Sequence, residues 1–437
     1  MSAPVVTRSR RGLVGLLIAD GVSILGTRMS ALAVPWFVLV TTGSATAAGV
    51  AAFAELGPYV AAQALGGPAL DRLGAWRTRV GSDLLAAAGA ATVPLLWAVG
   101  ALPFGALCAV LAVVGVARGF GDIAGYVLVP GVVERAGTPM ARATGLHDGV
   151  RRVAGLVGAP LAGVLIAVTS APLVLVVDAV TFATASLVVL ATVPRSAQPA
   201  RTEPAPAAAG TSAVRTYVTE LTAGFRFLRG DRLLLGIAVM VTVTNTLDQA
   251  ASSVLTPVWA SDVAGSSVAL GLISGAVGVG AVTGNVVAAW LGPRLPGRLT
   301  FGIGFLLAGA PRFAALALAT TVSPVLVVAV VAGMGAGVLN PIIGAAEFAR
   351  VPRELQARVL GSLNAVAWLG MPVGGLVAGL AVDHVGLVPT LWGAASLYLV
   401  TTLAPFVFPA WKALDEPVVE LEVGFANSDG VGATPSG

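Results

Sequence analysis

Long apolar runs separated by short polar loops extend along almost the whole chain. The runs reach the roughly 20 residues that an α-helix needs to cross a bilayer. Their apolar positions are continuous rather than alternating, which favours helices over a membrane barrel. The pattern therefore predicts an all-α integral membrane protein with about twelve transmembrane helices. The expected first residues are Leu13, Ala45, Val80, Pro103, Ala143, Pro172, Leu233, Ser267, Leu299, Ser323, Val359 and Leu387.

A polar stretch in the middle of the chain divides these runs six and six. Residues 194–212 are rich in proline, alanine and arginine, a composition typical of a flexible linker. An amphipathic helix follows, with Tyr217, Leu221, Phe225 and Leu228 on one face. The expected division is an N-terminal six-helix half (1–193), a cytoplasmic linker with this helix (194–231), a C-terminal six-helix half (232–410) and a disordered cytoplasmic tail (411–437).

The two halves also share a weak internal repeat. Residues 141–165 align with residues 357–381, and several small residues coincide, including Gly158 with Gly374 and Gly163 with Gly379. Repeated halves of this kind predict two pseudo-symmetric six-helix halves. They are typical of transporters whose halves rock against each other.

The charge distribution distinguishes the two sides of the membrane. Only 11% of the residues are charged, against about 25% in soluble domains. The net charge of +4 does not indicate nucleic-acid binding, because the arginines gather in alternate loops. By the positive-inside rule, both termini are expected in the cytoplasm. The bias toward arginine, alanine, glycine and valine suggests a bacterial source, and hence a multi-pass protein of the bacterial cytoplasmic membrane.

The chain offers little for catalysis or metal binding. Cys108 is the only cysteine, and His147 and His384 are the only histidines, so neither an intrachain disulfide nor a multi-histidine metal site is expected. His147 stands without a second ligand and is expected to be non-functional. We find no nucleophile–base set and no nucleotide loop. The sequence thus predicts a monomeric non-enzyme without metal or cofactor.

A short motif lies between the second and third apolar runs. It consists of Gly67, Asp71, Arg72 and Gly74, followed by Arg77. The spacing resembles the loop 2–3 signature of the major facilitator superfamily, although that family usually has two basic residues where only Arg77 stands here. The resemblance implies a hinge that gates the cytoplasmic side. In the family an acid at the cytoplasmic end of helix 4 receives the hinge arginine, and Glu134 fits that place.

Other stretches resemble the bacterial macrolide-efflux-type drug exporters of this superfamily. They are residues 33–44, 118–122 and 178–182. The small residues Gly155, Gly158, Pro160 and Gly163 resemble the antiporter signature of such exporters. Ordinary close packing of membrane helices is the alternative explanation of that last pattern.

Several ionisable residues fall inside the predicted spans, where each costs about 2.5–3.5 kcal/mol on insertion scales. Such residues tend to face a cavity or each other. Glu55 is the first candidate for a proton carrier, because it lies near mid-span with no basic residue close in sequence. Asp248 is the second, and a purely structural role is the alternative for both. The further cavity candidates are Asp20, Asp122, Arg118 and Arg28, of which Arg118 and Asp122 are spaced to pair on one helix face.

These patterns favour a secondary active transporter. The expected activity is proton-coupled efflux of a small amphipathic drug or secondary metabolite by alternating access, with Na⁺ as the alternative coupling ion. An importer with the same fold, and a non-transporting membrane sensor or enzyme, are the alternative functions.

Overall fold

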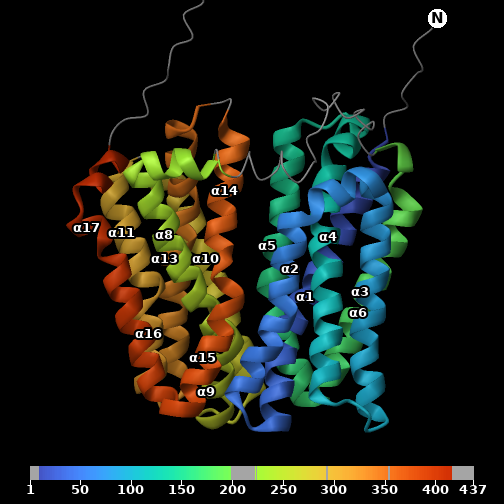
Figure 1. The fold of residues 1–437 in the computed structure, drawn as a ribbon, viewed down its shortest axis with the longest axis horizontal. Helices are drawn as coiled ribbons and strands as arrows, with labels where there is room; N and C mark the ends of the chain where they lie inside the picture. The colour runs from blue at the N-terminus through green and yellow to red at the C-terminus, as the bar shows by residue number, and fades with distance from the viewer. Residues whose placement is uncertain (1–8, 198–221, 223, 292–293, 353–354, 416–437) are drawn as a thin grey trace, which may run out of the picture.

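The computed structural model describes residues 9–197, 222, 224–291, 294–352 and 355–415, and these residues are almost entirely helical. Two helical bundles stand side by side (Figure 1). The N-terminal bundle contains α1 (Arg11–Thr42), α2 (Ala45–Leu73), α3 (Ala75–Ala98), α4 (Phe104–Ala136), α5 (Met140–Val168) and α6 (Ala171–Thr192), followed by the short turn η1 (Arg195–Ala197).

The C-terminal bundle is built from more and shorter helices. They are α8 (Arg232–Ala250), η2 (Ala251–Leu255), α9 (Thr256–Asp262), α10 (Ser267–Leu291), α11 (Gly297–Ala308), α12 (Ala310–Leu318), α13 (Val322–Arg350), α14 (Gln356–Leu369), α15 (Met371–Val385), α16 (Leu387–Thr402), α17 (Ala404–Val407) and η5 (Pro409–Leu414).

Eleven helical segments in the described residues are long and apolar enough to cross a membrane. The helix α2 is not among them, although it has 29 residues and runs alongside α4 (Figure 1). Polar residues such as Glu55 and Gln63 lower its mean hydropathy, and we count it as the twelfth span. The prediction of an all-helical membrane fold is therefore confirmed, and the predicted starts fall close to the observed ones. The largest difference is at α3, which begins at Ala75 rather than at Val80.

Three C-terminal spans are interrupted by irregular turns. The π-helical turn η2 separates α8 from α9. The breaks at Gly309 and Gly370 each precede a proline, Pro311 and Pro372, whose missing N–H cannot continue a helical ladder. A Cβ atom at Gly309 would overlap the ring of Tyr398, so this glycine also permits the close approach of α16. Such interruptions are tolerated within a membrane where neighbouring helices or a cavity cover them.

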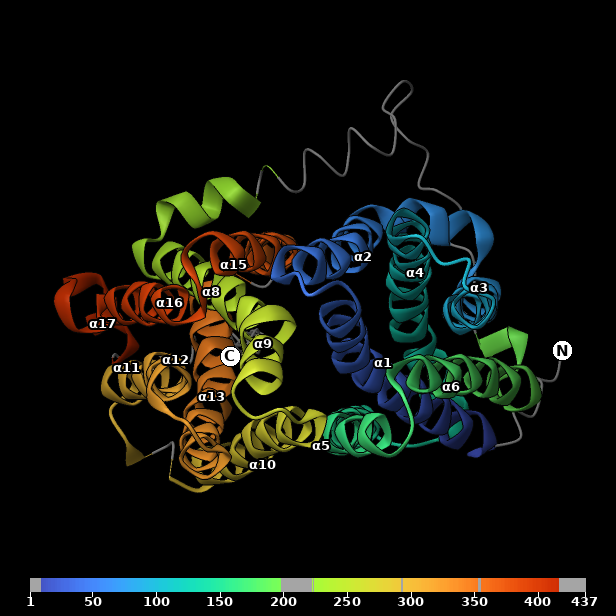
Figure 2. The same ribbon diagram turned by 90° about the horizontal axis from the view of Figure 1, so that it is seen from below.

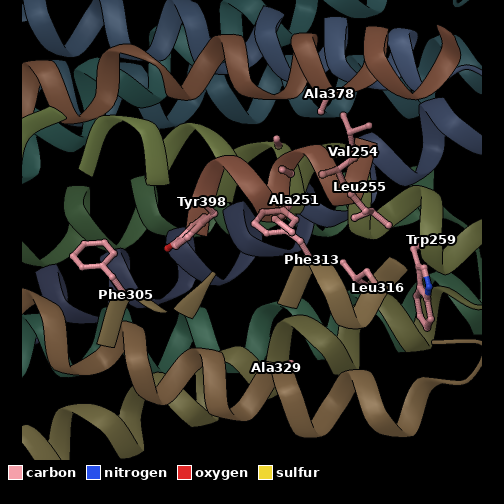
Figure 3. Close-up of a cluster of buried hydrophobic side chains, with 14 of the residues drawn as sticks. Ala251, Val254, Leu255, Trp259, Phe305, Phe313, Leu316, Ala329, Ala378 and Tyr398 are labelled. Carbon is pink, nitrogen blue, oxygen red and sulfur yellow. The ribbon is translucent and has the colours of Figure 1, made fainter. Parts of the chain in front are cut away.

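The C-terminal bundle packs around an apolar cluster rich in aromatic residues (Figure 3). Phe313 and Tyr398 lie with their ring centroids 6.0 Å apart, and Trp259 is fully buried at the far end of the same cluster. The interior of the N-terminal bundle differs, because it contains every fully buried charged side chain of the described residues. These are Asp20, Arg79, Asp83 and Asp178.

The two bundles meet along two seams, α2 against α15 and α5 against α10 (Figure 2). Glycines allow both contacts. A Cβ atom at Gly163 would lie 2.6 Å from the carbonyl oxygen of Ser267, and one at Gly379 would overlap the carbonyl oxygen of Ala45. Gly163 and Gly379 are the residues that the internal repeat aligns, so the repeat corresponds to symmetric helix contacts.

Part of the predicted organisation lies outside the described residues, namely most of the linker (198–221) and most of the tail (416–437). Of the predicted amphipathic helix, residues 224–230 are described as helical. Leu228 is buried against Leu234 and Val359 of the C-terminal bundle, whereas Phe225 is exposed.

Candidate functional site

A cavity of about 630 Å³ lies between the two bundles. Its walls come from α1 and α5 on one side and from η2, α9, α10 and α12 on the other. Most of its lining is apolar, and its charged lining residues are Arg28, Asp148, Arg151, Arg152 and Arg312. Its size and its position between two halves suit a small-molecule site.

Glu55 on α2 forms an ion pair with Arg118 on α4. A Cβ atom at Gly115 would overlap the backbone of Glu55, so the absence of a side chain there brings the two helices together. The predicted pairing of Arg118 with Asp122 is wrong, because Asp122 instead accepts a hydrogen bond of 2.9 Å from the hydroxyl of Tyr59. The sequence spacing was compatible with either partner, and the close approach of α2 selects Glu55.

Asp20 on α1 is the centre of a buried charge cluster. Its two carboxylate oxygens lie 3.0 Å from Nη1 of Arg79 and 2.9 Å from Nε2 of His147. The Nε of Arg79 donates to Asp83 at 2.9 Å. His147, for which the sequence offers no second metal ligand, thus has a buried carboxylate as its partner. Arg79, which the apolar pattern placed in a loop, is only 3% exposed, because α3 begins one turn earlier than predicted.

Asp178 on α6 differs from the other buried carboxyl groups, because the described residues give it hydroxyl partners and no ion pair. Ser30 on α1 donates to it at 2.5 Å, and Thr181 lies 3.4 Å away. The side chain is 3% exposed. Gly26 permits this contact, since a Cβ atom there would crowd both Asp178 and Thr181. Asp178 is one of the ionisable residues inside the predicted spans and belongs to a stretch that carries the resemblance, but it was not among the candidate proton carriers.

Asp248, the second candidate, is half-buried and forms an ion pair with Arg312. It lies on α8, just before the π-helical turn η2, while Arg312 lies on α12 and reaches the central cavity. π-Helical turns often mark functional positions. This one places Ala251 and Ser252 in the cavity wall.

The hinge motif forms the tight turn between α2 and α3. Gly74 has φ +84°, a conformation that L side chains rarely adopt, and its N–H donates to the carbonyl of Leu70 at 2.8 Å. Arg72, Arg77 and Glu134 are exposed, and no ion pair joins Arg77 to Glu134 among the described residues. The surroundings of Gly67 and the side chain of Asp71 lie outside the described part of the structure. Their roles stay predictions.

The antiporter-like residues of α5 face two directions. Gly155 and Gly158 lie against Arg28 of α1, and a Cβ atom at Gly158 would be 2.7 Å from the Cβ of Arg28. Pro160 and Gly163 instead lie against α10 of the other bundle, at Gly271 and Gly275. The stretch therefore joins the cavity wall to one of the two seams.

Asp383 on α15 is a further contact between the bundles that the sequence did not reveal. Its carboxylate accepts hydrogen bonds from the hydroxyl of Ser44 (2.8 Å) and from the backbone N–H groups of Ala45 (3.1 Å) and Thr46 (2.9 Å). A carboxylate at a helix N-terminus satisfies unpaired N–H groups and complements the helix dipole. We call this contact the Asp383 latch.

Two bundles of membrane-spanning helices with a cavity between them define a polytopic membrane transport protein. Residues 16–267 and 238–428 match the model of the Major Facilitator Superfamily, and the chain belongs to this family. It is 28% identical to the multidrug efflux pump Tap of Mycobacterium tuberculosis over 403 residues, covering 92% of this chain and 94% of the relative. The Tap protein of Mycolicibacterium fortuitum is 27% identical over 418 residues, covering 94% and 99%.

Solved structures support the same fold. The nucleoside transporter NupG aligns with a TM-score of 0.68 at 15% identity, covering 91% of this chain and 99% of that one. A bacterial homologue of the iron transporter ferroportin, in an inward-facing state, aligns with a TM-score of 0.62 at 17% identity, covering 91% and 99%. The predicted family and fold are thus confirmed, and the chain is a transporter related to multidrug efflux pumps.

Proposed function

We propose that this transporter exports a small amphipathic compound by alternating access, driven by proton entry. The observation that carries the proposal is the similarity to multidrug efflux pumps over 92% of the chain. The central cavity supports it, because a substrate bound there would contact both bundles at once. Rocking of one bundle against the other would then expose that substrate to either side of the membrane.

The contacts between the bundles support a state closed at one end. The Asp383 latch, Gly379 against Ala45 and Gly163 against Ser267 all lie toward the end where α1 finishes and α2 starts. That end is opposite to the chain termini (Figure 1). With both termini in the cytoplasm, as the positive-inside rule predicts, the outer end is the closed one. The cavity would then load from the cytoplasm, as export requires.

Asp178 is the carboxyl group that we favour as the proton carrier. A hydroxyl can donate to a carboxylate and accept from a carboxylic acid, so Ser30 suits both protonation states of Asp178. Asp178 lies within electrostatic reach of Arg118 and Glu55. Glu55 is held in an ion pair by Arg118, which stabilises its charged form and makes it a less suitable proton carrier. In this proposal Glu55 is not the proton carrier but a neighbouring charge that interacts with Asp178.

The hinge motif is proposed to act in the opposite state. When the cytoplasmic ends of the bundles close, Asp71, Arg77 and Glu134 would supply the charged contacts there, and Gly74 provides the tight turn. The exposure of Arg77 and Glu134 fits a structure whose closed end is the other one.

Everted membrane vesicles that hold a pH gradient test the function. Addition of lipophilic drugs and metabolites, one at a time, should dissipate the gradient for particular compounds. Vesicles with Asp178→Asn, present at the same level, should not respond. Vesicles with Asp262→Asn should respond, because that carboxylate is exposed at the end of α9 and does not line the cavity. Accumulation of the compounds by intact cells would contradict export and establish import.

A further inference from the structure

We infer that the central cavity binds an anionic group of the substrate, a carboxylate, through Arg28, Arg151 and Arg312. The inference rests on the proposed transport function and adds the chemical class of the substrate. A drug transporter whose cavity favoured cations would be expected to present carboxylates, whereas this cavity presents mainly arginines.

The cavity lining has an excess of positive charge. Four arginines and one carboxylate, Asp148, are its charged lining residues. Asp148 is engaged by Arg152 at 2.8 Å, which leaves Arg28, Arg151 and Arg312 to be balanced from elsewhere.

Each of these three arginines has unused hydrogen-bonding capacity. Arg28 and Arg151 have no ion pair among the described residues, and Arg151 lies over the ring of Tyr126, 5.5 Å from its centroid. Arg312 uses Nη2 to reach Asp248, and its buried Nε has no hydrogen-bond partner in the described structure. The buried Nε is out of reach of a ligand in the cavity, so a substrate anion would bond the other guanidinium nitrogens of the lining arginines.

The charges behind the cavity wall do not cancel the excess. Asp248 balances Arg312 in part. Asp122 lies near Arg28 but is accompanied there by Arg118, and Arg118 is paired with Glu55. Asp20 lies near Arg151 but is already held by Arg79 and His147. The guanidinium groups facing the cavity therefore remain the dominant charges.

The uncharged lining residues indicate the chemistry of the part of the ligand that carries no charge. Leu32, Leu156, Ile273 and Val277 provide apolar walls, and Thr256 adds a hydroxyl-bearing side chain. An amphipathic compound with an apolar body and a carboxylate head fits this division. Arginine suits that head, because its planar fork binds carboxylates in bidentate geometry.

The glycines of α5 give Arg28 its position. A Cβ atom at Gly155 would lie 3.7 Å from Nε of Arg28, and Gly158 lies against the Cβ of the same residue. The absence of side chains at these two positions lets the Arg28 side chain lie along α5 toward Arg151. In this proposal the antiporter-like motif positions Arg28 to bind the anion.

Three matched probes test the inference with the purified full-length protein in detergent. Naphthylacetate, naphthylacetamide and naphthylethylammonium share an aromatic body and differ in charge. Their affinities follow from the concentration dependence of thermal stabilisation, since a ligand that binds the folded state raises its stability. We expect naphthylacetate to bind at least about tenfold more tightly than the other two probes, as a charge-assisted bond predicts.

Substitutions then assign the preference to the arginines. Arg28→Gln and Arg151→Gln should each weaken naphthylacetate binding about tenfold and leave naphthylacetamide binding unchanged, which also shows that the variants are folded. Arg28→Lys should give an intermediate value. Arg142→Gln, an exposed arginine on the same helix as Arg151 but outside the cavity lining, should match wild type.

Two results would overturn the inference. One is a carboxylate probe that stabilises the protein no more than the amide or the ammonium probe. The other is unchanged naphthylacetate affinity in both glutamine variants. Because binding is measured without a membrane or a gradient, either result would leave the export proposal standing on the vesicle assay. Conversely, a vesicle assay without any response would leave the binding result unaffected.

Discussion

The two bundles are alike where they touch and unlike inside. At the seams, Gly163 of α5 and Gly379 of α15 occupy repeat-related positions, and each brings its helix onto the backbone of the opposite bundle. In the interior, the N-terminal bundle buries Asp20, Arg79 and Asp178, whereas the C-terminal bundle is packed around aromatic side chains. The symmetric fold therefore holds an asymmetric distribution of charge.

This difference separates two tasks that a coupled transporter must perform. Under the proposed alternating access, the symmetric glycine seams would serve the rocking movement, in which both bundles take part. Buried ionisable groups are costly in a membrane, and our proposal assigns the proton chemistry to the bundle that buries most of them. The C-terminal bundle contributes the half-buried pair of Asp248 and Arg312 at the cavity wall. On this account the N-terminal bundle carries the proton coupling, and the C-terminal bundle contributes the opposite wall of the cavity.

The largest effect is expected from breaking the buried charge cluster. Arg79→Leu leaves Asp20 and Asp83 without their shared cation, and removal of one partner from a buried pair costs about 3–5 kcal/mol. The variant should unfold at a much lower temperature in detergent. The matched change in the other bundle, Arg312→Leu, should cost less, because Asp248 is half-buried.

A neutral replacement of the whole cluster provides the control. Asp20→Asn and Asp83→Asn added to Arg79→Leu should recover much of the lost melting temperature, since no uncompensated charge remains. Equal losses for Arg79→Leu and Arg312→Leu would show that the charge asymmetry between the bundles has no energetic consequence.

An intermediate effect is expected at the glycine seams. Gly163→Ala and Gly379→Ala each place a methyl group against backbone atoms of the opposite bundle. Overpacking costs about 1–3 kcal/mol, so the closed outer end should be disfavoured and transport should fall about tenfold. The two variants should behave alike, because the seams are equivalent.

Another repeat-related pair of glycines serves as the seam control. Gly145 and Gly361 align in the same repeat, and a Cβ atom at either would meet open space. Gly145→Ala and Gly361→Ala should transport like wild type. A strong loss of transport in these control variants would show that the effect is not specific to the seams. Unchanged transport in Gly163→Ala and Gly379→Ala would show that the seams do not limit the movement.

The smallest effect is expected at the Asp383 latch. Asp383→Ala removes exposed hydrogen bonds that water largely replaces, for a total of about 1 kcal/mol, so the outer end should open a few times more often. In a Cys108→Ser background, a cysteine at the cavity residue Ser252 reports this opening by its labelling rate with an impermeant thiol reagent added outside. An unchanged labelling rate would show that the Asp383 latch does not hold the outer end closed.

The fold was predictable from the sequence because its signals are local. Apolar runs located the helix starts, and Gly74 marked a turn whose positive φ requires a glycine. The site was less predictable because its contacts are distant in sequence. His147 meets Asp20 from another helix, and Asp383 reaches α2 from the other bundle. No spacing rule connects such residues.

Hydropathy also misplaced a residue at a span boundary. Arg79 precedes the apolar run at Val80 and was therefore assigned to a loop, although it lies within α3. Its spacing of four residues from Asp83 was the available signal, since residues so spaced share a helix face. Glu55 was chosen because no basic residue is near it in sequence, and α4 supplied one in space.

Proton release on substrate binding tests the central claim most directly. Purified protein in weakly buffered detergent is mixed with a compound identified by the vesicle assay, and the pH is followed. Wild type and Asp248→Asn should release protons as the compound binds, whereas Asp178→Asn should bind it without release. Release that survives in Asp178→Asn and disappears in Asp248→Asn would contradict the account and move the coupling site to the C-terminal bundle.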